Sequence, residues 1–427
     1  MSANDEDCDV VICGGGVGGL ALAVALGRLG YRVIVLERRR TETRVHRGEF
    51  LQPHTIQIFH EWDTLPLLME RGALPIRGMD NLDANGTWLG TLNYELLPPP
   101  FNHGLVHDYH EIKRVLFDTA KRATDIRLGA QATELLRDGC GRTTGVRIAI
   151  DGSEHTVRAR LVVAADGMAS RIREAAGMAG TPIAYGHQLM ALDLENVTSL
   201  EPRNLGFVTD DGVRVLYPMP GNRARLYVQI RQGEFKSIRE MGMARWKDRL
   251  LGVAPGLRIV GDHFPRDLKH AQVLGAWRFC APTWVVPGLA LLGDAAHCVH
   301  PIAGQGMNTA IADAFELSRA LARYAAGTMP SRDAVDRALE AYDTIRRPRF
   351  MHTARLCHYM SVYCTSQSSI LRRAVQYIAR SNRENRRLQY IVAYNVSGLG
   401  VRRFTWRDRL YQFGLRSDPN ARDIGLG

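Results

Sequence analysis

The chain has 427 residues, of which 45% are hydrophobic and 23% charged, and its formal net charge is +11. This composition is ordinary for a soluble globular protein, and the length exceeds what one hydrophobic core usually serves. We therefore expect two lobes, or one large domain with an appendage. The acidic N-terminus lacks the apolar segment of a signal peptide, and no uninterrupted apolar stretch reaches about 18 residues, so neither secretion nor a membrane-spanning helix is expected.

Seven cysteines are scattered along the chain without a Cys-x-x-Cys pair. An odd number at irregular spacing argues against a disulfide framework, a zinc site and a dithiol redox centre. These observations favour a cytoplasmic location.

The excess positive charge lies in the C-terminal fifth of the chain. Residues 341–427 contain 16 arginines, no lysine and five acidic residues, a net charge equal to that of the whole chain. Such a segment either faces an anionic lipid surface or nucleic acid, or forms a solvated helical surface. Residues 370–378 (ILRRAVQYI) mix arginines with apolar residues as an interfacial helix does, although an ordinary packed helix has the same pattern.

The first predicted elements form a βαβ unit. Residues 9–13 (DVVIC) and 32–36 (RVIVL) are predicted to be buried strands, and 20–29 a helix with an Ala/Leu face. The run 14–19 (GGGVGG) lies between the first strand and the helix and fits the pattern G-x-G-x-x-G. This context predicts dinucleotide binding, although a glycine-rich turn in any α/β protein is the alternative.

Each position of the glycine motif has a physical role in that prediction. Gly14 permits the tight turn, Gly16 lets the backbone approach a pyrophosphate, and Gly19 lets the helix pack on the sheet. The diphosphate would then lie at the helix N-terminus, where free N–H groups and the helix dipole favour an anion. Glu37, at the end of the second strand, is placed to accept hydrogen bonds from the adenosine ribose. The motif does not distinguish FAD from NAD.

The next predicted elements are a helix over 108–122 and a hairpin of strands 145–150 and 156–160. Asp151-Gly152 favours the hairpin turn. A separate buried strand over 161–165 is expected to end at Asp166-Gly167, within the run AADGMASRIR.

From 181 to 276 polar and apolar residues alternate between turns, which is typical of an antiparallel sheet. This block is predicted to form a separate substrate lobe. The expected strands are 213–219, 223–231 and 273–278.

A third motif follows a buried strand at 289–292 and precedes a long helix at 306–324. The strand delivers Gly293-Asp294 to the sheet edge, where Asp294 can accept a hydrogen bond from a ribityl hydroxyl. Pro301 stiffens the following loop, and glycines in that loop let the backbone approach an isoalloxazine ring. The N–H groups of the next helix can stabilise negative charge on that ring. A strand–loop–helix corner with a capping Asp would explain one such motif, but not three in this order.

The motifs GGGVGG, AADGMASRIR and LLGDAAHCVHPIAGQGMN, in this order, resemble those of the single-component FAD-dependent monooxygenases typified by para-hydroxybenzoate hydroxylase. The resemblance covers residues 8–350 and implies an α/β fold with a Rossmann-like FAD-binding domain, an antiparallel-sheet substrate domain and a helical C-terminal segment. In that family the Asp-Gly motif serves both FAD and a transient NADPH, and the matching positions here are Asp166 and Arg173. The implied domains are 1–73, 101–180 and 277–345 for FAD, 74–100 and 181–276 for the substrate, and 346–427 for the basic segment.

Two segments depart from the family pattern. The run RGEFLQP at 47–53 is closer to squalene monooxygenase, and either Arg44 or Arg47 corresponds to the arginine of the flavin loop. Tyr109 stands where a flavin-contacting Gln or Arg is common in the family. The residues expected to bind FAD are Gly14, Gly16, Gly18, Gly19, Glu37, Arg38, Arg47, Tyr109, Asp166, Gly293, Asp294, Gly304, Gly306, Met307 and Asn308, with Pro301 near the ring.

The resemblance implies that NADPH or NADH reduces FAD and that one oxygen atom of O2 is inserted into a lipophilic aromatic or alkene substrate, by hydroxylation or epoxidation, as in secondary metabolism. The cofactor carries this chemistry, so no catalytic side chain and no metal is assigned. His297, Cys298 and His300 are poorly spaced for a metal site. A phenolic substrate would profit from a base, and the candidates, each of which could equally be a packed residue, are His107, Tyr185, His187 and Tyr217.

Two alternatives stay open, and a flavin-dependent halogenase, which would share the fold, is disfavoured. The Trp-x-Trp-x-Ile-Pro run of flavin-dependent halogenases is absent. Prenyl-chain reductases share the fold and reduce alkenes without O2, and a flavin-binding protein could act through partner contact of the Arg-rich tail. The expected partners are a small-molecule substrate and O2 rather than nucleic acid, and the basic segment leaves a peripheral contact with a membrane open.

Overall fold

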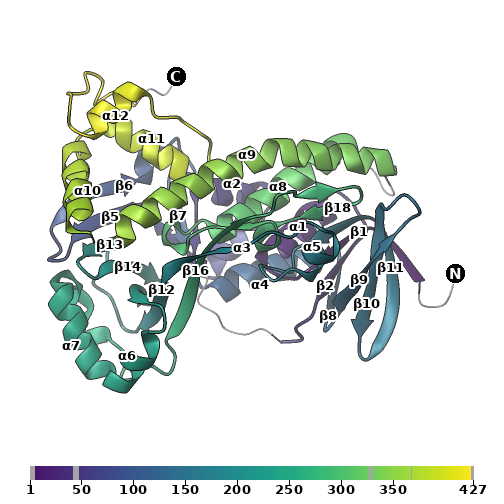
Figure 1. Ribbon diagram of the computed structural model, residues 1–427, viewed down its shortest axis with the longest axis horizontal. Coiled ribbons are helices and arrows are strands. Elements are labelled where there is room, and N and C mark those ends of the chain that lie inside the picture. Colours follow the sequence, from purple (N-terminus) through teal and green to yellow (C-terminus); the bar gives the residue numbers. More distant parts are fainter. Residues whose placement is uncertain (1–4, 42–47, 327–329, 367, 425–427) are drawn as a thin grey trace.

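The computed structural model describes residues 5–41, 48–326, 330–366 and 368–424 (Figure 1). It is a mixed α/β structure in which one large sheet lies at the right of Figure 1 and a second lies toward the left. The long helix α9 (Arg332–Thr365) runs across both along the top of the view.

The first sheet has eight strands, and its centre is parallel, in the order β17-β18-β11-β1-β2-β8. Its helices α1 and α8 pack on each other, and α4 packs on α1. These helices are α1 (Val17–Arg28), α4 (Tyr109–Ala120) and α8 (Gly306–Tyr324). The strands are β1 (Asp5–Cys13), β2 (Val33–Glu37), β8 (Asp125–Leu128), β9 (Gln131–Arg137), β10 (Thr143–Ile150), β11 (Ser153–Ala164), β17 (Val285–Val286) and β18 (Leu289–Leu291).

The βαβ unit is confirmed, as is the helix over 306–324. Val10, Val11 and Ile12 on β1 are at most 2% exposed, as expected for a parallel strand covered on both faces. One expectation is wrong: the hairpin strand at 156–160 and the buried strand at 161–165 are a single strand, β11. Its first half pairs with β10 and its second half with β18, so one continuous strand has the two textures that suggested two elements.

The second sheet has eight strands in the order β19-β16-β12-β15-β14-β13-β5-β6, and its neighbours are antiparallel except β13 and β5. Helices α6 (Phe235–Met241) and α7 (Met243–Val253) cover one of its faces, where Trp246 and Leu250 pack against Met190 and Leu192. The strands are β5 (Gly78–Asp83), β6 (Trp88–Asn93), β12 (Ile183–Leu194), β13 (Asn204–Thr209), β14 (Gly212–Met219), β15 (Arg223–Arg231), β16 (Gln272–Cys280) and β19 (His297–Cys298).

Short elements connect the two sheets. A small sheet joins β3 (Phe50–Leu51), β7 (Gly104–Val106) and β4 (Leu74–Ile76). Two helices lie between β3 and β4 in the chain, and the first packs on α8 and β7 and the second on α4. These helices are α2 (Pro53–Glu61) and α3 (Leu65–Glu70).

The C-terminal segment is helical and gathers at the upper left of Figure 1. It contains α10 (Ser369–Asn382), α11 (Arg386–Val396) and α12 (Trp406–Gln412), and both α10 and α11 contact β6. The expected boundary at 345/346 falls inside α9, which crosses it without a break. Within the described ranges, no helix has the length and apolar character needed to cross a membrane.

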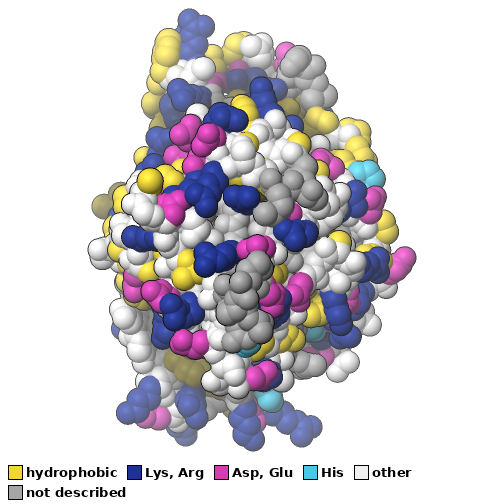
Figure 2. All heavy atoms as spheres, turned by 90° about the vertical axis from the view of Figure 1, so that its right-hand side faces the viewer, with side chains coloured by type: hydrophobic (Ala, Val, Ile, Leu, Met, Phe, Trp, Pro, Cys, Tyr) yellow, Lys and Arg dark blue, Asp and Glu magenta, His cyan; other side chains and the backbone are white. Residues whose placement is uncertain are grey.

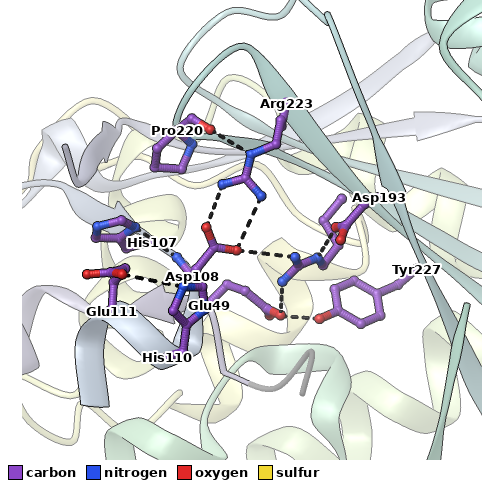
Figure 3. A network of polar contacts seen from close by, with 10 residues as sticks. Glu49, His107, Asp108, His110, Glu111, Asp193, Pro220, Arg223 and Tyr227 are labelled. Carbon is purple, nitrogen blue, oxygen red and sulfur yellow. Dashed lines mark hydrogen bonds and ion pairs between the residues drawn. The ribbon is translucent and has the colours of Figure 1, made fainter. Parts of the chain in front are cut away.

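A buried arginine, Arg225, joins the second sheet to the segments next to the first, and Figure 3 labels its acidic partners Glu49, Asp108 and Asp193. Arg225 on β15 is 2% exposed, and its guanidinium donates to Glu49 Oε1 at 2.6 Å, Asp193 Oδ1 at 2.7 Å and Asp108 Oδ1 at 3.3 Å. The Tyr227 hydroxyl donates to the other oxygen of Glu49 at 2.7 Å, and Arg223 pairs with Asp108. Burial lowers the pKa of Arg225, but Glu49 and Asp193 raise it above its usual value. The arginine is therefore charged at every accessible pH.

We expect Arg225→Met to lower the free energy of unfolding by about 3–5 kcal/mol, because it leaves the Glu49 carboxylate buried without its cation. Denaturant unfolding followed by circular dichroism measures this. The matched control is Arg231→Ala on the same strand, whose side chain is 73% exposed and pairs with Glu234; it should change stability by about 0.5 kcal/mol or less. Equal effects of the two substitutions would contradict the role given to Arg225.

Candidate functional site

The glycine-rich turn between β1 and α1 leaves the N-terminus of α1 uncapped. No side chain caps this helix, whose N-cap is Gly16, and its first turn has no acidic residue. A Cβ on Gly19 would lie 2.0 Å from the Gly14 carbonyl oxygen and one on Gly18 would lie 2.6 Å from Leu292, but one on Gly16 would have no atom within 4 Å. Gly18 and Gly19 are thus required for packing, whereas Gly16 borders open space beside free N–H groups, as a diphosphate needs.

Glu37 lies against this turn. Its Oε2 accepts a hydrogen bond from the Gly15 N–H at 3.0 Å, and its Oε1 accepts one from the Arg39 N–H at 2.8 Å. A carboxylate has about four acceptor sites, so two bonds leave capacity for a ribose hydroxyl. Arg38, the next residue, is exposed.

The Asp-Gly turn after β11 is held mainly by local hydrogen bonds. Asp166 Oδ2 accepts from the Arg171 N–H at 3.0 Å, at the start of α5 (Arg171–Ala175), and burial raises the pKa of this carboxyl group. Arg173 is buried and donates to the carbonyl oxygens of Met168 at 2.7 Å and Ala295 at 2.8 Å. Arg173 therefore ties the Asp-Gly turn to the Gly-Asp turn that follows β18.

The Gly-Asp turn depends on a fully buried carboxylate of α8. Asp313 Oδ2 accepts from the Gly293 N–H at 2.9 Å and faces His297 Nε2 at 2.8 Å, while Arg346 Nε of α9 donates to Oδ1 at 2.7 Å. Burial raises the pKa of Asp313, but His297 and Arg346 lower it below its usual value. Asp294 is exposed at the tip of this turn. Sequence reasoning missed Asp313 and Arg346; the available signal was a charged residue on the apolar face of a helix.

The loop before α8 contains the 3-10 turn η4 (Pro301–Ala303), followed by Gly304 at φ +59. A Cβ on Gly306, the first residue of α8, would meet no atom within 4 Å, so this helix N-terminus also borders open space. Met307 is 8% exposed and lies against Gly48, so its side chain packs within the protein.

Asn308 holds this loop to the segment 50–55. Its Nδ2 donates to the carbonyl oxygens of Phe50 and Gly304, and its Oδ1 accepts from the Gln52 N–H and the Thr55 hydroxyl. The side chain is fully used within the protein, so its contribution to a cofactor is limited to the backbone.

The remaining residues expected to contact FAD are Tyr109 and the arginine of the flavin loop. Tyr109 begins α4, directly after the Asp108 carboxylate that pairs with Arg223. Arg44 and Arg47 lie outside the described residues.

One face of the second sheet is apolar and lies against the loop before α8. Its buried members are Leu189, Ala191, Val213, Val215 and Tyr227, in one cluster with Ile302. Tyr217 and Cys364 of α9 are partly buried at its edge. Burial raises the pKa of Tyr217, which therefore stays protonated at neutral pH.

Four polar rings meet at the end of this face. Tyr185 and His187 come from β12, His300 precedes Pro301, and His358 comes from α9. The His187 and His300 Nε2 atoms are 2.8 Å apart, and the Tyr185 hydroxyl is 3.1 Å from His358 Nδ1. The structure thus brings two of the four base candidates together, Tyr185 and His187. Of the other two, Tyr217 lies at the edge of the apolar face, and His107 lies at the corner between β7 and α4, where its Nδ1 accepts from the Asp108 N–H at 2.9 Å.

The tautomers of the histidine pair follow from one backbone contact. The Ile302 N–H donates to His300 Nδ1 at 3.1 Å, so the proton of neutral His300 is on Nε2 and is donated to His187. His187 Nε2 is then an acceptor, and its own proton is on Nδ1. Burial lowers the pKa of His187, and burial with the neighbouring His187 and His358 lowers that of His300 to about 3. The pair is therefore neutral at pH 7.

The residues considered for a metal site have other partners. His297 faces Asp313 and His300 faces His187. In the part of the chain that the structure describes, no three His, Cys, Asp or Glu residues are grouped as metal ligands would be.

Figure 2 shows the molecule from the side of the first sheet, with positive and negative side chains interspersed and hydrophobic ones scattered. Among the described residues of this face, charges of both signs therefore lie side by side.

Comparison with known proteins matches residues 7–356 to the family described as "FAD binding domain". The chain is 29% identical over 360 residues to 6-methylpretetramide 4-monooxygenase of Streptomyces rimosus, covering 83% of this chain and 84% of that protein. It is 29% identical to the ubiquinone hydroxylase UbiL of Rhodospirillum rubrum over 366 residues, 81% of this chain and 79% of that protein.

The chain is also similar in structure to a solved protein. PqsL of P. aeruginosa, in complex with 2-aminobenzoylacetate, has 25% sequence identity and a TM-score of 0.77, covering 85% of this chain and 98% of that one. With both helix N-termini bordering open space, the residues present fit FAD. This chain is a member of the FAD-binding-domain family and is an FAD-dependent monooxygenase.

Proposed function

We propose that this enzyme uses NADPH or NADH to hydroxylate an apolar aromatic ring that bears a hydroxyl group. The apolar sheet face around Leu189 and Val215, with a neutral histidine pair at its end, carries this proposal. An apolar face binds a lipophilic ring, and a polar group at its end orients a single oxygen. The relatives named for 6-methylpretetramide 4-monooxygenation and ubiquinone hydroxylation support ring hydroxylation.

FAD would be held by the two uncapped helix N-termini and the turns between them. In this proposal the N–H groups of α1 hold the diphosphate, Glu37 the ribose, and Asp294 the ribityl chain, while Gly304 and Gly306 leave room for the ring next to Pro301. Bound FAD supplies the activation of O2 and the transfer of one oxygen atom. The chain positions the substrate and excludes water from the ring.

We assign His187 the role of hydrogen-bond donor to the substrate oxygen. With Nε2 already accepting from His300, the remaining polar atom is the Nδ1–H, which stabilises a phenolate rather than removing its proton. A phenolate is more electron-rich than the phenol, so this donor favours attack at the ring. Epoxidation of an alkene, as the name of the relative squalene epoxidase erg1 of Schizosaccharomyces pombe describes, would need no such donor.

The direct test mixes the purified enzyme with NADPH or NADH and hydroxylated aromatic compounds, and follows O2 uptake and product mass. We expect a product heavier by one oxygen atom, with O2 consumed. A reduced or dehydrogenated product without O2 use would identify a reductase or dehydrogenase instead.

His187→Leu should lower kcat by about 100-fold or more, whereas His187→Gln, which keeps an N–H donor, should recover much of that loss. A general base would not be rescued by Gln. Because burial lowers the pKa of His187 below 6.5, the ring is neutral and keeps its Nδ1–H at every pH above 6.5, so kcat of the unmodified enzyme should show no inflection from this ring there. His155→Asn on β11 serves as the control and should leave kcat and the profile unchanged.

Gly16→Ala should fold normally but bind FAD at least about tenfold more weakly, because the added methyl group enters the space next to the free N–H groups of α1. Gly16 has φ −75, so alanine adopts its backbone without strain. Fluorescence titration of the apoprotein with FAD measures this. Gly139→Ala, where a Cβ also meets no atom within 4 Å, should leave FAD affinity unchanged; an equal loss in both variants would contradict the assignment.

A further inference from the structure

The C-terminal segment exposes large apolar side chains on one continuous surface, which we call the C-terminal patch. Ile370 and Tyr377 of α10 are 81% and 57% exposed, and Phe413 and Leu415, in the turn after α12, are 46% and 72% exposed. Helices α10 and α12 lie at the upper left of Figure 1, apart from α1, and the proposed function does not use these residues.

Tyr377, Phe413 and Leu415 are neighbours because α10 and the end of α12 pack together, and Ile370 lies two turns before Tyr377 on the same face of α10. A Cβ on Gly414 would lie 2.9 Å from the Tyr377 hydroxyl, so the turn containing Phe413 and Leu415 abuts the middle of α10. Asn382 at the end of α10 donates to the Gln412 carbonyl oxygen at 2.6 Å and fixes this arrangement. The patch therefore has a defined shape.

Arginines surround the apolar residues. Arg373 and Arg380 are exposed on α10 at helical spacing from Tyr377, and Arg416 is exposed next to Leu415. The acidic residues of this segment are outnumbered, because residues 341–427 hold 16 arginines and five acidic residues. Asp408 and Asp418 pair with Arg387, at 2.6 and 2.9 Å, and Glu384 pairs with Arg383. Apolar residues ringed by arginines are the composition of a surface that lies on anionic lipid.

We propose that the C-terminal patch docks the enzyme on the surface of a membrane that contains anionic lipids. A second copy of the chain would bring two arginine-rich surfaces together, which charge repulsion opposes. Nucleic acid would be bound by the arginines but would not use Ile370 and Leu415, which contain no group that reads a phosphate or a base. A bilayer interface satisfies both the charge and the apolar side chains.

The position of α9 connects this surface to the apolar sheet face. Cys364, near the end of α9, packs at the edge of the cluster around Leu189, whereas Tyr359 and Tyr363 on the same helix end are 56% and 44% exposed. The Thr365 carbonyl accepts from the Gln229 side chain of β15 at 3.2 Å. Docking through α10 would thus bring the last turns of α9, and the apolar face behind them, close to the lipid.

The test is co-sedimentation of the full-length enzyme with vesicles of phosphatidylcholine alone or of phosphatidylcholine with phosphatidylglycerol. We expect binding to the anionic vesicles only, weakened by salt. Ile370→Ser, Tyr377→Ser and Leu415→Ser combined should weaken it at least about tenfold. Arg373→Gln, Arg380→Gln and Arg416→Gln combined should weaken it by about fivefold for each arginine removed.

The control combines Leu29→Ser, Leu128→Ser and Ile259→Ser, which remove exposed apolar residues outside the patch; this variant should bind like the unmodified enzyme. Circular dichroism checks that every variant is folded. The proposal is overturned if the enzyme does not bind anionic vesicles, or if the control loses binding equally. It is also overturned if a DNA fragment displaces the enzyme from the vesicles and the serine substitutions leave DNA binding unchanged. Hydroxylase activity is not the readout, so failure here is distinct from failure of the proposed function.

Discussion

The buried guanidinium of Arg225 is the interaction on which the relative position of the two sheets depends. An unpaired charge at this depth would cost several kcal/mol, so the fold must supply acidic partners from more than one segment. Glu49 comes from the segment before β3, Asp108 from the turn before α4, and Asp193 from β12. Because all three must converge on one side chain, the sheet that bears the apolar face is set at a defined place relative to the cofactor turns.

The cofactor turns are held by buried polar side chains that each make several hydrogen bonds, and not by the glycines alone. Asp313 binds the Gly-Asp turn to α8 and α9, and Asn308 binds the loop before α8 to the segment after Glu49. Neither side chain need touch the cofactor. Their value lies in preorganisation, since a flavin enzyme supplies position and electrostatics while the cofactor performs the chemistry.

The histidine pair illustrates how a backbone group can decide the chemistry of a side chain. The Ile302 N–H imposes one tautomer on His300, and His300 passes that choice to His187. Burial keeps both rings neutral, so each ring donates one hydrogen bond and accepts one, and the donation runs from Ile302 through His300 to His187. The sequence made His187 a candidate base, but in this environment its Nδ1–H is placed to donate a hydrogen bond.

The sequence by itself determined the βαβ unit, the three cofactor motifs, the helix over 306–324 and the antiparallel texture of the second sheet, because these depend on local periodicity and on glycines at fixed offsets. It did not separate one long strand, β11, from two short ones, since the change in burial along that strand comes from its neighbours. Glu49, Asp108 and Arg225 are 59 to 176 residues apart in sequence, and no spacing rule connects them. Only the tertiary structure brought these charges together and set His187 against His300, because burial and pairing are properties of the surroundings and not of the residue.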